Sequence, residues 1–190
     1  MKRKINVLVA SILLLSMAAV SYAQPYKGGI GIVTGNMYGV QGKLFLKPKL
    51  ALQADLACKL GAYPWGYGYK FSSTIGIFEL NPNLLYQSNI KEWSCGQLDW
   101  FAGGGLSLGF TYIYDYSDYN YPYGYKTIAG KFGTNAIGGV ELSLSKVPLA
   151  FAVDFRPGFG MLLTKKYAIF YFDWAATASV RYCFGQTKGK

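Results

Sequence analysis

Apolar and polar residues alternate one by one along most of this chain. In the segment Leu50–Ala62 (LALQADLACKLGA), Leu52 and Leu56 share one parity, whereas Gln53 and Asp55 lie on the other. Because successive side chains of an extended strand point to opposite faces, a period of two predicts a β-strand with one apolar and one polar face. The architecture of the protein then depends on which of these two faces looks inward.

The same alternation recurs often enough to predict eight strands and no helix beyond the first 23 residues. The expected strands are Lys27–Gly35, Tyr38–Leu46, Leu50–Ala62, Phe78–Gln87, Leu98–Tyr112, Lys131–Leu144, Leu149–Leu163 and Phe172–Phe184. Tight connections at Lys47–Lys49 and Ser145–Pro148, and a modest one near Ser88–Ser94, alternate with longer tyrosine-containing connections at Tyr63–Ser72 and Asp115–Lys126. Short turns at one end and longer loops at the other are typical of an outer-membrane β-barrel, whose even strand count returns both termini to the short-turn end.

Charged residues of the predicted strands lie on the polar parity and nearly balance one another. We expect the following residues to form an ion network in the lumen: Lys43, Asp55, Lys59, Glu79, Asp99, Lys131, Glu141, Asp154, Arg156, Asp173 and Arg181. Six of them are acidic and five are basic, as buried charges require, because each desolvated ion needs a partner. Small residues occupy most other polar positions, which suits the narrow bore of eight strands.

Aromatic residues gather near both ends of the predicted strands. Tyr86, Trp93, Trp100, Tyr182 and Phe184 fall toward the short turns, and Tyr38, Phe110, Tyr112, Phe170 and Phe172 toward the long loops. Two aromatic girdles are typical of a barrel that spans a membrane. We therefore predict an all-β, closed, antiparallel transmembrane barrel with its apolar face toward lipid. The alternative is a soluble secreted β-barrel that binds a ligand in an apolar cavity, with the two faces exchanged.

The beginning of the chain predicts a cleaved signal peptide over residues 1–23. Met1–Lys4 is basic, Ile5–Val20 is mostly apolar, and Ser21–Ala23 offers small residues at the positions that signal peptidase reads. Residues 24–190 are then expected to form one outer-membrane barrel domain with both termini in the periplasm.

Composition argues against catalysis. The chain contains no histidine, which excludes histidine-dependent triads and removes the commonest metal ligand. Cys58, Cys95 and Cys183 fit no zinc-site spacing, so we interpret them as small apolar residues. Asp154 and Arg156 are two residues apart on one face, which indicates an ion pair rather than an acid–base pair. We expect no catalytic residue, cofactor or metal, and no nucleic-acid partner, because the basic residues form no concentrated patch.

Two tyrosine-rich loops are candidate surfaces for an extracellular sugar or protein ligand. The residues of this expected loop platform are Trp65, Tyr67, Tyr116, Tyr119, Tyr121, Tyr123 and Tyr125. Tyrosine offers a large contact area at low entropic cost; the alternative is an extended hairpin whose rings rest at the membrane interface. Lys70, Lys126, Lys165 and Lys166 are expected at the same rim, where they either bind phosphates of outer-membrane lipid or remain solvated.

The whole predicted barrel resembles the small outer-membrane proteins of the OmpA-, OmpX- and OmpW-like class. FELNPNLLYQ (Phe78–Gln87) and VDFRPGFG (Val153–Gly160) are similar to segments of barrel proteins common in Bacteroidetes. The resemblance implies a structural or surface-interaction protein, or alternatively a narrow porin-like path for small or apolar solutes.

The last predicted strand also resembles the assembly signal of such barrels. Thr177, Ser179, Tyr182 and Phe184 stand at its positions, although Ser179 replaces the usual glycine. The resemblance implies that the barrel assembly machinery recognises Tyr182 and Phe184.

Two prolines fall inside predicted strands. Pro82 and Pro157 each remove a ladder donor from a sheet that is expected to have no free edge. We therefore expect a β-bulge at each proline.

Overall fold

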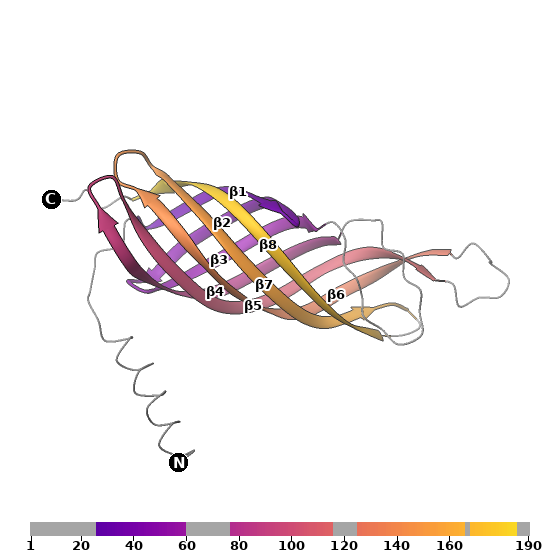
Figure 1. Ribbon diagram of the computed structural model, residues 1–190. Helices are drawn as coiled ribbons and strands as arrows, with labels where there is room; N and C mark the ends of the chain where they lie inside the picture. Colours follow the sequence, from indigo (N-terminus) through magenta and orange to yellow (C-terminus); the bar gives the residue numbers. More distant parts are fainter. Residues whose placement is uncertain (1–25, 60–76, 116–124, 166–167, 186–190) are drawn as a thin grey trace, which may run out of the picture.

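The computed structural model describes residues 26–59, 77–115, 125–165 and 168–185, which form eight strands. The strands are β1 (Gly28–Gly35), β2 (Met37–Lys47), β3 (Leu50–Lys59), β4 (Ile77–Trp93), β5 (Gly96–Asp115), β6 (Tyr125–Leu144), β7 (Leu149–Leu163) and β8 (Ala168–Phe184). Each strand pairs antiparallel with the next, and β1 pairs with β8, so the sheet closes on itself (Figure 1). The prediction of an eight-stranded, closed, antiparallel barrel is confirmed. The signal peptide expected over residues 1–23 lies outside the described residues.

The alternation of polar and apolar residues in the sequence matches the alternation of buried and exposed side chains in the strands. Along β8, exposed and buried residues alternate without a break from Ala168 to Phe184. In β3, Leu52 and Leu56 are exposed, whereas Asp55 and Lys59 are buried inside the barrel. The polar parity of the sequence is therefore the inner face. No helix within the described ranges combines the length and the apolarity that crossing a membrane requires.

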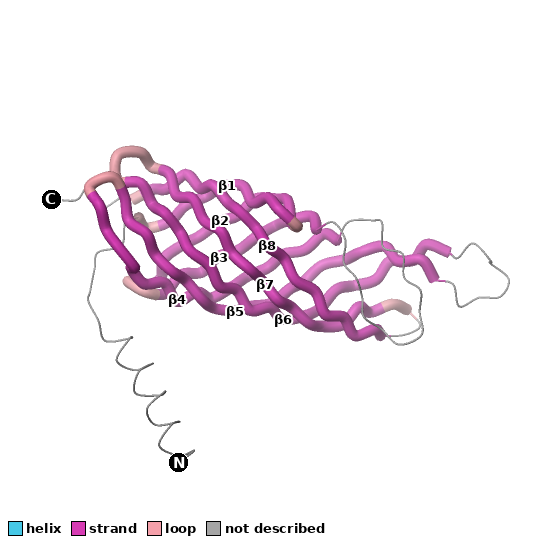
Figure 2. Tube along the Cα trace, in the orientation of Figure 1, coloured by secondary structure: helices cyan, strands magenta, loops and turns pink. Residues whose placement is uncertain are grey.

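The β2–β3, β4–β5 and β6–β7 turns lie together at one end of the barrel (Figure 2), and the one-residue β1–β2 turn at Asn36 lies at the other end. Gly28, the first residue of β1, pairs with Phe184, the last residue of β8, so the described ends of the chain lie at the same end as those three turns. The connection expected near Ser88–Ser94 is wrong: β4 continues to Trp93, and Ser94 and Cys95 alone join it to β5. Alternation is lost there because the ladder shifts register between Asn89 and Lys91.

The expected bulges at Pro82 and Pro157 are also wrong. Pro82 pairs with Ala54 of β3, and the β4–β5 ladder skips two positions and resumes in unchanged register. Pro157 pairs with Trp174 of β8, and the β6–β7 ladder has the same kind of gap. A strand residue directs its N–H toward one neighbour only. A proline therefore opens one ladder locally, and no extra residue is needed.

Close strand packing makes one glycine of β1 sensitive to substitution. A Cβ atom at Gly31 would lie 1.9 Å from the carbonyl oxygen of Val180, whereas a Cβ at Gly42 of β2 would meet nothing within 4 Å. Since strand β8 would have to move, we expect Gly31→Ala to lower the free energy of unfolding by about 1–3 kcal/mol. Urea unfolding of the folded barrel measures this loss. Gly42→Ala is the matched control, and equal losses in the two variants would contradict the prediction.

Candidate functional site

The eleven charged residues expected in the lumen are all buried, with at most 9% of any of them exposed. Their ion pairs are Lys43–Glu141, Lys59–Asp173, Lys131–Glu79, Lys131–Asp173, Arg156–Asp55, Arg156–Asp154 and Arg181–Glu141. Every strand except β1 contributes at least one of these residues, since each presents its polar parity to the lumen. Six of the seven pairs connect different strands, and Arg156–Asp154 lies within β7.

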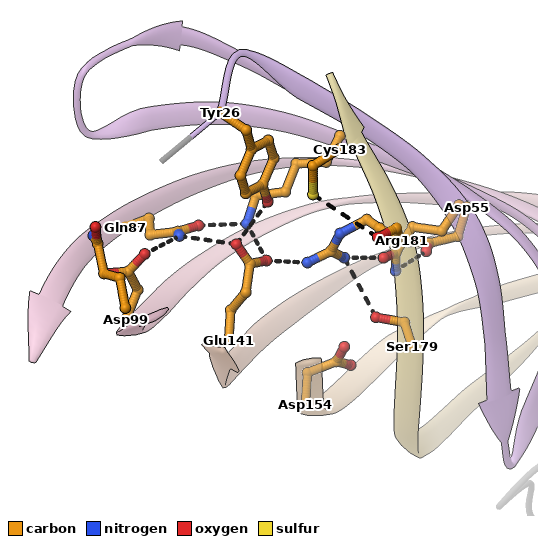
Figure 3. A network of polar contacts seen from close by, with 12 residues as sticks. Tyr26, Asp55, Gln87, Asp99, Glu141, Asp154, Ser179, Arg181 and Cys183 are labelled. Atoms are coloured by element: carbon orange, nitrogen blue, oxygen red, sulfur yellow. Dashed lines mark hydrogen bonds and ion pairs between the residues drawn. The ribbon is translucent and has the colours of Figure 1, made fainter. Parts of the chain in front are cut away.

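A first network, at the short-turn end, is centred on Glu141 of β6. Its Oε2 accepts hydrogen bonds from Lys43 Nζ at 2.8 Å and from the Arg181 guanidinium. Its Oε1 accepts from the Tyr26 hydroxyl at 2.6 Å and from Gln87 Nε2 at 3.1 Å. Figure 3 shows Tyr26, Gln87 and Arg181 converging on Glu141 from different elements. One carboxylate thus joins β2, β4, β8 and Tyr26, which lies two residues before β1.

Asp99 of β5 is held differently from the other carboxylates. Of the eleven charged lumen residues that the structure describes, Asp99 alone takes part in none of the seven ion pairs. Instead it accepts hydrogen bonds from the side-chain amides of Gln87 at 2.8 Å, Asn89 at 3.2 Å and Gln97 at 2.7 Å. Gln87 links this carboxylate to Glu141, so Asp99 belongs to the first network.

The middle of the lumen is occupied by Arg156 of β7 and two carboxylates. Its Nη1 bonds to Asp55 at 2.6 Å, and its Nε bonds to Asp154 at 2.5 Å. Gln41 donates to Asp55 at 2.6 Å and accepts from Arg181, which connects this layer to the first network. A guanidinium between two carboxylates satisfies several fixed donors at once, the geometry that favours arginine over lysine.

The second network lies nearer the long-loop end and is centred on Lys131 of β6. Lys131 Nζ donates to Glu79 and to Asp173, the latter at 3.0 Å, and lies 5.0 Å from the centroid of the Tyr171 ring. Lys59 donates to the same carboxylate of Asp173 at 2.9 Å. Two lysines and two carboxylates therefore neutralise one another in this layer.

Apolar side chains also enter the lumen, which the pattern of charged positions did not predict. Ala51, Leu85, Phe101, Ile137 and Ala152 form one buried cluster on the inner face. Lys43 Nζ lies 5.1 Å from the centroid of the Phe101 ring, so this cluster packs against the first ion network. These residues occupy the inward parity, and that position was the available signal for finding them.

Tyr26 is a further residue that the sequence pattern missed. It is 1% exposed and packs against Ala150, Cys183 and the edge of the Phe45 ring. It precedes the first strand, so no alternation marks it. Its hydroxyl reaches Glu141 only because the chain closes with β1 beside β8.

The space left between the two networks is small. A polar cavity of about 10 Å³ is lined by Lys59, Glu79, Arg156 and Asp173 together with smaller neighbours. That volume accommodates about one water molecule. In the described part of the chain, no three histidine, cysteine, aspartate or glutamate side chains cluster as metal ligands would. The contacts that the described residues make across the lumen are ion pairs and hydrogen bonds.

The other predicted sites fall largely beyond the described part of the chain. In the loop platform, Trp65, Tyr67, Tyr116, Tyr119, Tyr121 and Tyr123 lie outside the described residues, and Tyr125 begins β6 with its side chain not described. In the lysine rim, Lys70 and Lys166 lie outside, Lys126 belongs to β6 with its side chain not described, and Lys165 is exposed after β7. These predictions stay predictions.

The C-terminal strand and the cysteines are described. Thr177 and Ser179 face inward on β8, while Tyr182 and Phe184 face outward and are exposed. Cys58 is half-buried, Cys95 is exposed in the β4–β5 turn and Cys183 is buried. All three are free thiols.

Comparison with known proteins identifies a shared fold. The crystal structure of Neisserial surface protein A (NspA) superposes with a TM-score of 0.54 over 83% of this chain and 93% of that chain, at 12% sequence identity. No protein-family model and no curated protein sequence matches the chain. At this identity the likeness establishes the fold alone: the chain has the small barrel architecture of NspA.

Proposed function

We propose that this chain is an integral outer-membrane β-barrel protein with a structural or surface-interaction role and a lumen filled by side chains. The observation that carries the proposal is that apolar side chains are exposed and charged side chains are buried, the reverse of a soluble protein. Large apolar residues are exposed on the outer face of every strand, among them Ile30, Leu56, Val153 and Phe170, whereas the lumen holds the charges. Soluble monomers rarely expose a contiguous apolar patch of more than a few hundred Å². A surrounding bilayer removes that cost.

Strand length and closure support a membrane location. Strands β2 to β8 have 10 to 20 residues, and a tilted strand needs about 9–11 residues to span a bilayer. A closed sheet leaves no unpaired edge in lipid, where water cannot satisfy backbone groups. Outward-facing Trp100 and Tyr182 near the short turns, with Phe110 and Phe172 nearer the long loops, fit two interfacial girdles.

The outer membrane is the favoured location for three reasons. The expected signal peptide implies export, the structural neighbour NspA is named a surface protein, and even-stranded barrels of this size are typical of that membrane. Short turns face the periplasm in such barrels, so both termini are proposed to be periplasmic. The exposed positions of Tyr182 and Phe184 on β8 fit recognition by the barrel assembly machinery.

A non-enzymatic role without transport fits the lumen better than the alternatives. Ion pairs cross the bore at several levels, and the cavity between them has room for about one water. A solute path would need a wider bore, and a ligand-binding soluble barrel would need an apolar cavity inside it, whereas the apolar hollow of about 360 Å³ beside Ile32, Val140 and Val153 is lined mainly by outward-facing residues. The proposed contacts with extracellular sugar or protein are assigned to the tyrosine-rich loops.

Cysteine scanning along β3 tests the orientation of the wall. In a background with Cys58, Cys95 and Cys183 replaced by alanine, residues 52, 53, 55 and 56 are changed singly to cysteine and labelled with a fluorophore. In lipid vesicles, a lipid-soluble quencher should reduce the signal from Leu52→Cys and Leu56→Cys strongly, and that from Gln53→Cys and Asp55→Cys little. The reverse pattern, or a folded monomer that dissolves in buffer without detergent, would overturn the proposal.

A further inference from the structure

The short-turn end of the barrel carries lysines that are scattered in the sequence. Lys27 precedes β1, Lys47 and Lys49 flank the β2–β3 turn, Lys91 lies near the end of β4, and Lys146 lies in the β6–β7 turn. We name these five residues the lysine collar. Four of them are exposed and Lys49 is partly exposed.

The collar is strongly basic. Among the residues described at this end, Glu92 is the one acidic side chain outside the lumen. Five lysines and one glutamate give this rim a net charge of +4. The acids of the neighbouring first network, Asp99 and Glu141, are buried inside the barrel and bonded there. The collar lysines therefore lie outside the lumen networks and form a basic rim.

The collar surrounds the mouth of the barrel rather than forming one patch. Its members stand at β1, at the β2–β3 turn, at β4 and at the β6–β7 turn, and these elements follow one another around the closed sheet (Figure 1). A ring of separated charges suits many small anionic groups better than one compact ligand.

Exposed aromatic side chains lie on the outer wall at the same end of the barrel as the collar. Trp93, Trp100 and Tyr182 are exposed on the outer wall near the short turns. Lys91 Nζ lies 5.4 Å from the centroid of the Trp93 ring. Tryptophan and tyrosine rings settle at the headgroup level of a bilayer, and lysine stems extend along apolar surface to bring the ammonium into the same zone.

We propose that the lysine collar binds the phosphate groups of anionic phospholipids in the leaflet next to the short turns. The proposal rests on the proposed membrane insertion and adds a lipid class and a leaflet to it. Basic side chains next to a membrane attract anionic lipid, and an ammonium binds phosphate as a point charge without a fixed orientation. Lipid is favoured over an anionic cell-wall polymer because Lys91 lies against the exposed Trp93 ring and the collar lysines are spread over four elements at this end of the barrel.

Spin-labelled lipids test the collar directly. The barrel is folded into phosphatidylcholine vesicles that contain trace spin-labelled phosphatidylglycerol or phosphatidylcholine, and the motionally restricted fraction of each is measured. At low salt we expect phosphatidylglycerol to be favoured by at least about threefold, and less at high salt because exposed charges are screened. Replacing all five collar lysines by glutamine should lower this preference at least about twofold, and replacing them by arginine should retain it.

The outcomes separate this proposal from the one on which it rests. A wild-type chain that does not fold into vesicles overturns both. A chain that folds there but does not prefer phosphatidylglycerol, or a glutamine variant with undiminished preference, overturns the collar alone. If the five-fold variant does not fold, the turn variant Lys47→Gln, Lys49→Gln, Lys146→Gln must show a reduced preference. A glutamine variant that keeps lipid preference but no longer pellets with purified peptidoglycan assigns the collar to the polymer and also overturns the proposal.

Discussion

Glu141→Gln is expected to lower the free energy of unfolding of the barrel by about 3–5 kcal/mol. The glutamine has nearly the same shape, but it has no charge with which to neutralise Lys43 and Arg181. Both cations would stay in the lumen, where the side chain of neither is exposed. Breaking a buried pair by removing one partner costs more than the pair itself contributes, because the remaining charge is still desolvated. Urea unfolding in lipid vesicles, followed by the shift of the folded band in gel electrophoresis, measures the loss.

Two further variants show whether this loss comes from unpaired charge. Glu92→Gln removes an acid from the exposed rim and should change stability by less than about 0.5 kcal/mol. Combining Glu141→Gln with Arg181→Met removes one of the two unpaired cations. The double variant should therefore lose less stability than the two single variants summed. If Glu141→Gln unfolds at the same urea concentration as the wild type, the first ion network does not hold the strands together.

Leu56→Arg is expected to cost about 2–4 kcal/mol in a bilayer, since an arginine on the lipid face is most destabilising near the midplane. Leu56 is 60% exposed and lies in the middle of the apolar wall, paired with Val40 on one side and Leu80 on the other. In a soluble barrel the same exposed position would tolerate a charge. The loss of stability therefore distinguishes lipid from water around the outer wall. It is measured as the folded fraction and the urea midpoint in vesicles.

The matched control for this variant is Leu46→Arg, at a different depth in the proposed bilayer. Leu46 is equally outward-facing but lies at the short-turn end of β2, and Leu46→Arg should cost about 0–1 kcal/mol because the arginine reaches the headgroups. A membrane barrel predicts a large difference between the two variants. Equal effects at Leu46 and Leu56 would contradict a bilayer around the wall.

The two networks and the collar divide the proposed protein into parts with separate tasks. Buried ion pairs contribute little net stability compared with packed apolar residues, but they fix which partners meet. If the pairing of one strand shifted by one residue, its two faces would be exchanged. Polar residues on the inner face of an eight-stranded barrel with an apolar outer wall therefore disfavour such a shift, because it would turn them toward lipid. We therefore expect the paired charges of the lumen to favour the observed register.

The sequence by itself determined the number of strands and, outside the irregular end of β4, the face that most strand residues occupy. Alternation in β3 was enough to put Leu52 and Leu56 on one wall and Asp55 and Lys59 on the other, because side-chain direction in a strand depends only on parity. The near balance of acids and bases on the inner parity likewise predicted a lumen rather than a surface. These are local properties, and no knowledge of neighbouring strands is required.

The Asp154–Arg156 ion pair was predicted from spacing alone, but tertiary structure decided which of the other charges meet. Tyr26 and Glu141 are 115 residues apart, and Arg181 and Gln41 are 140 apart, so no local pattern joins them. Their contacts depend on the register of all eight strand pairs together, which also carries the ladder past Pro82 without a bulge and gathers the collar lysines at one mouth. Register accumulates around a closed sheet, and the closure of β1 on β8 is the step that brings the first and last segments of the chain to the same carboxylate.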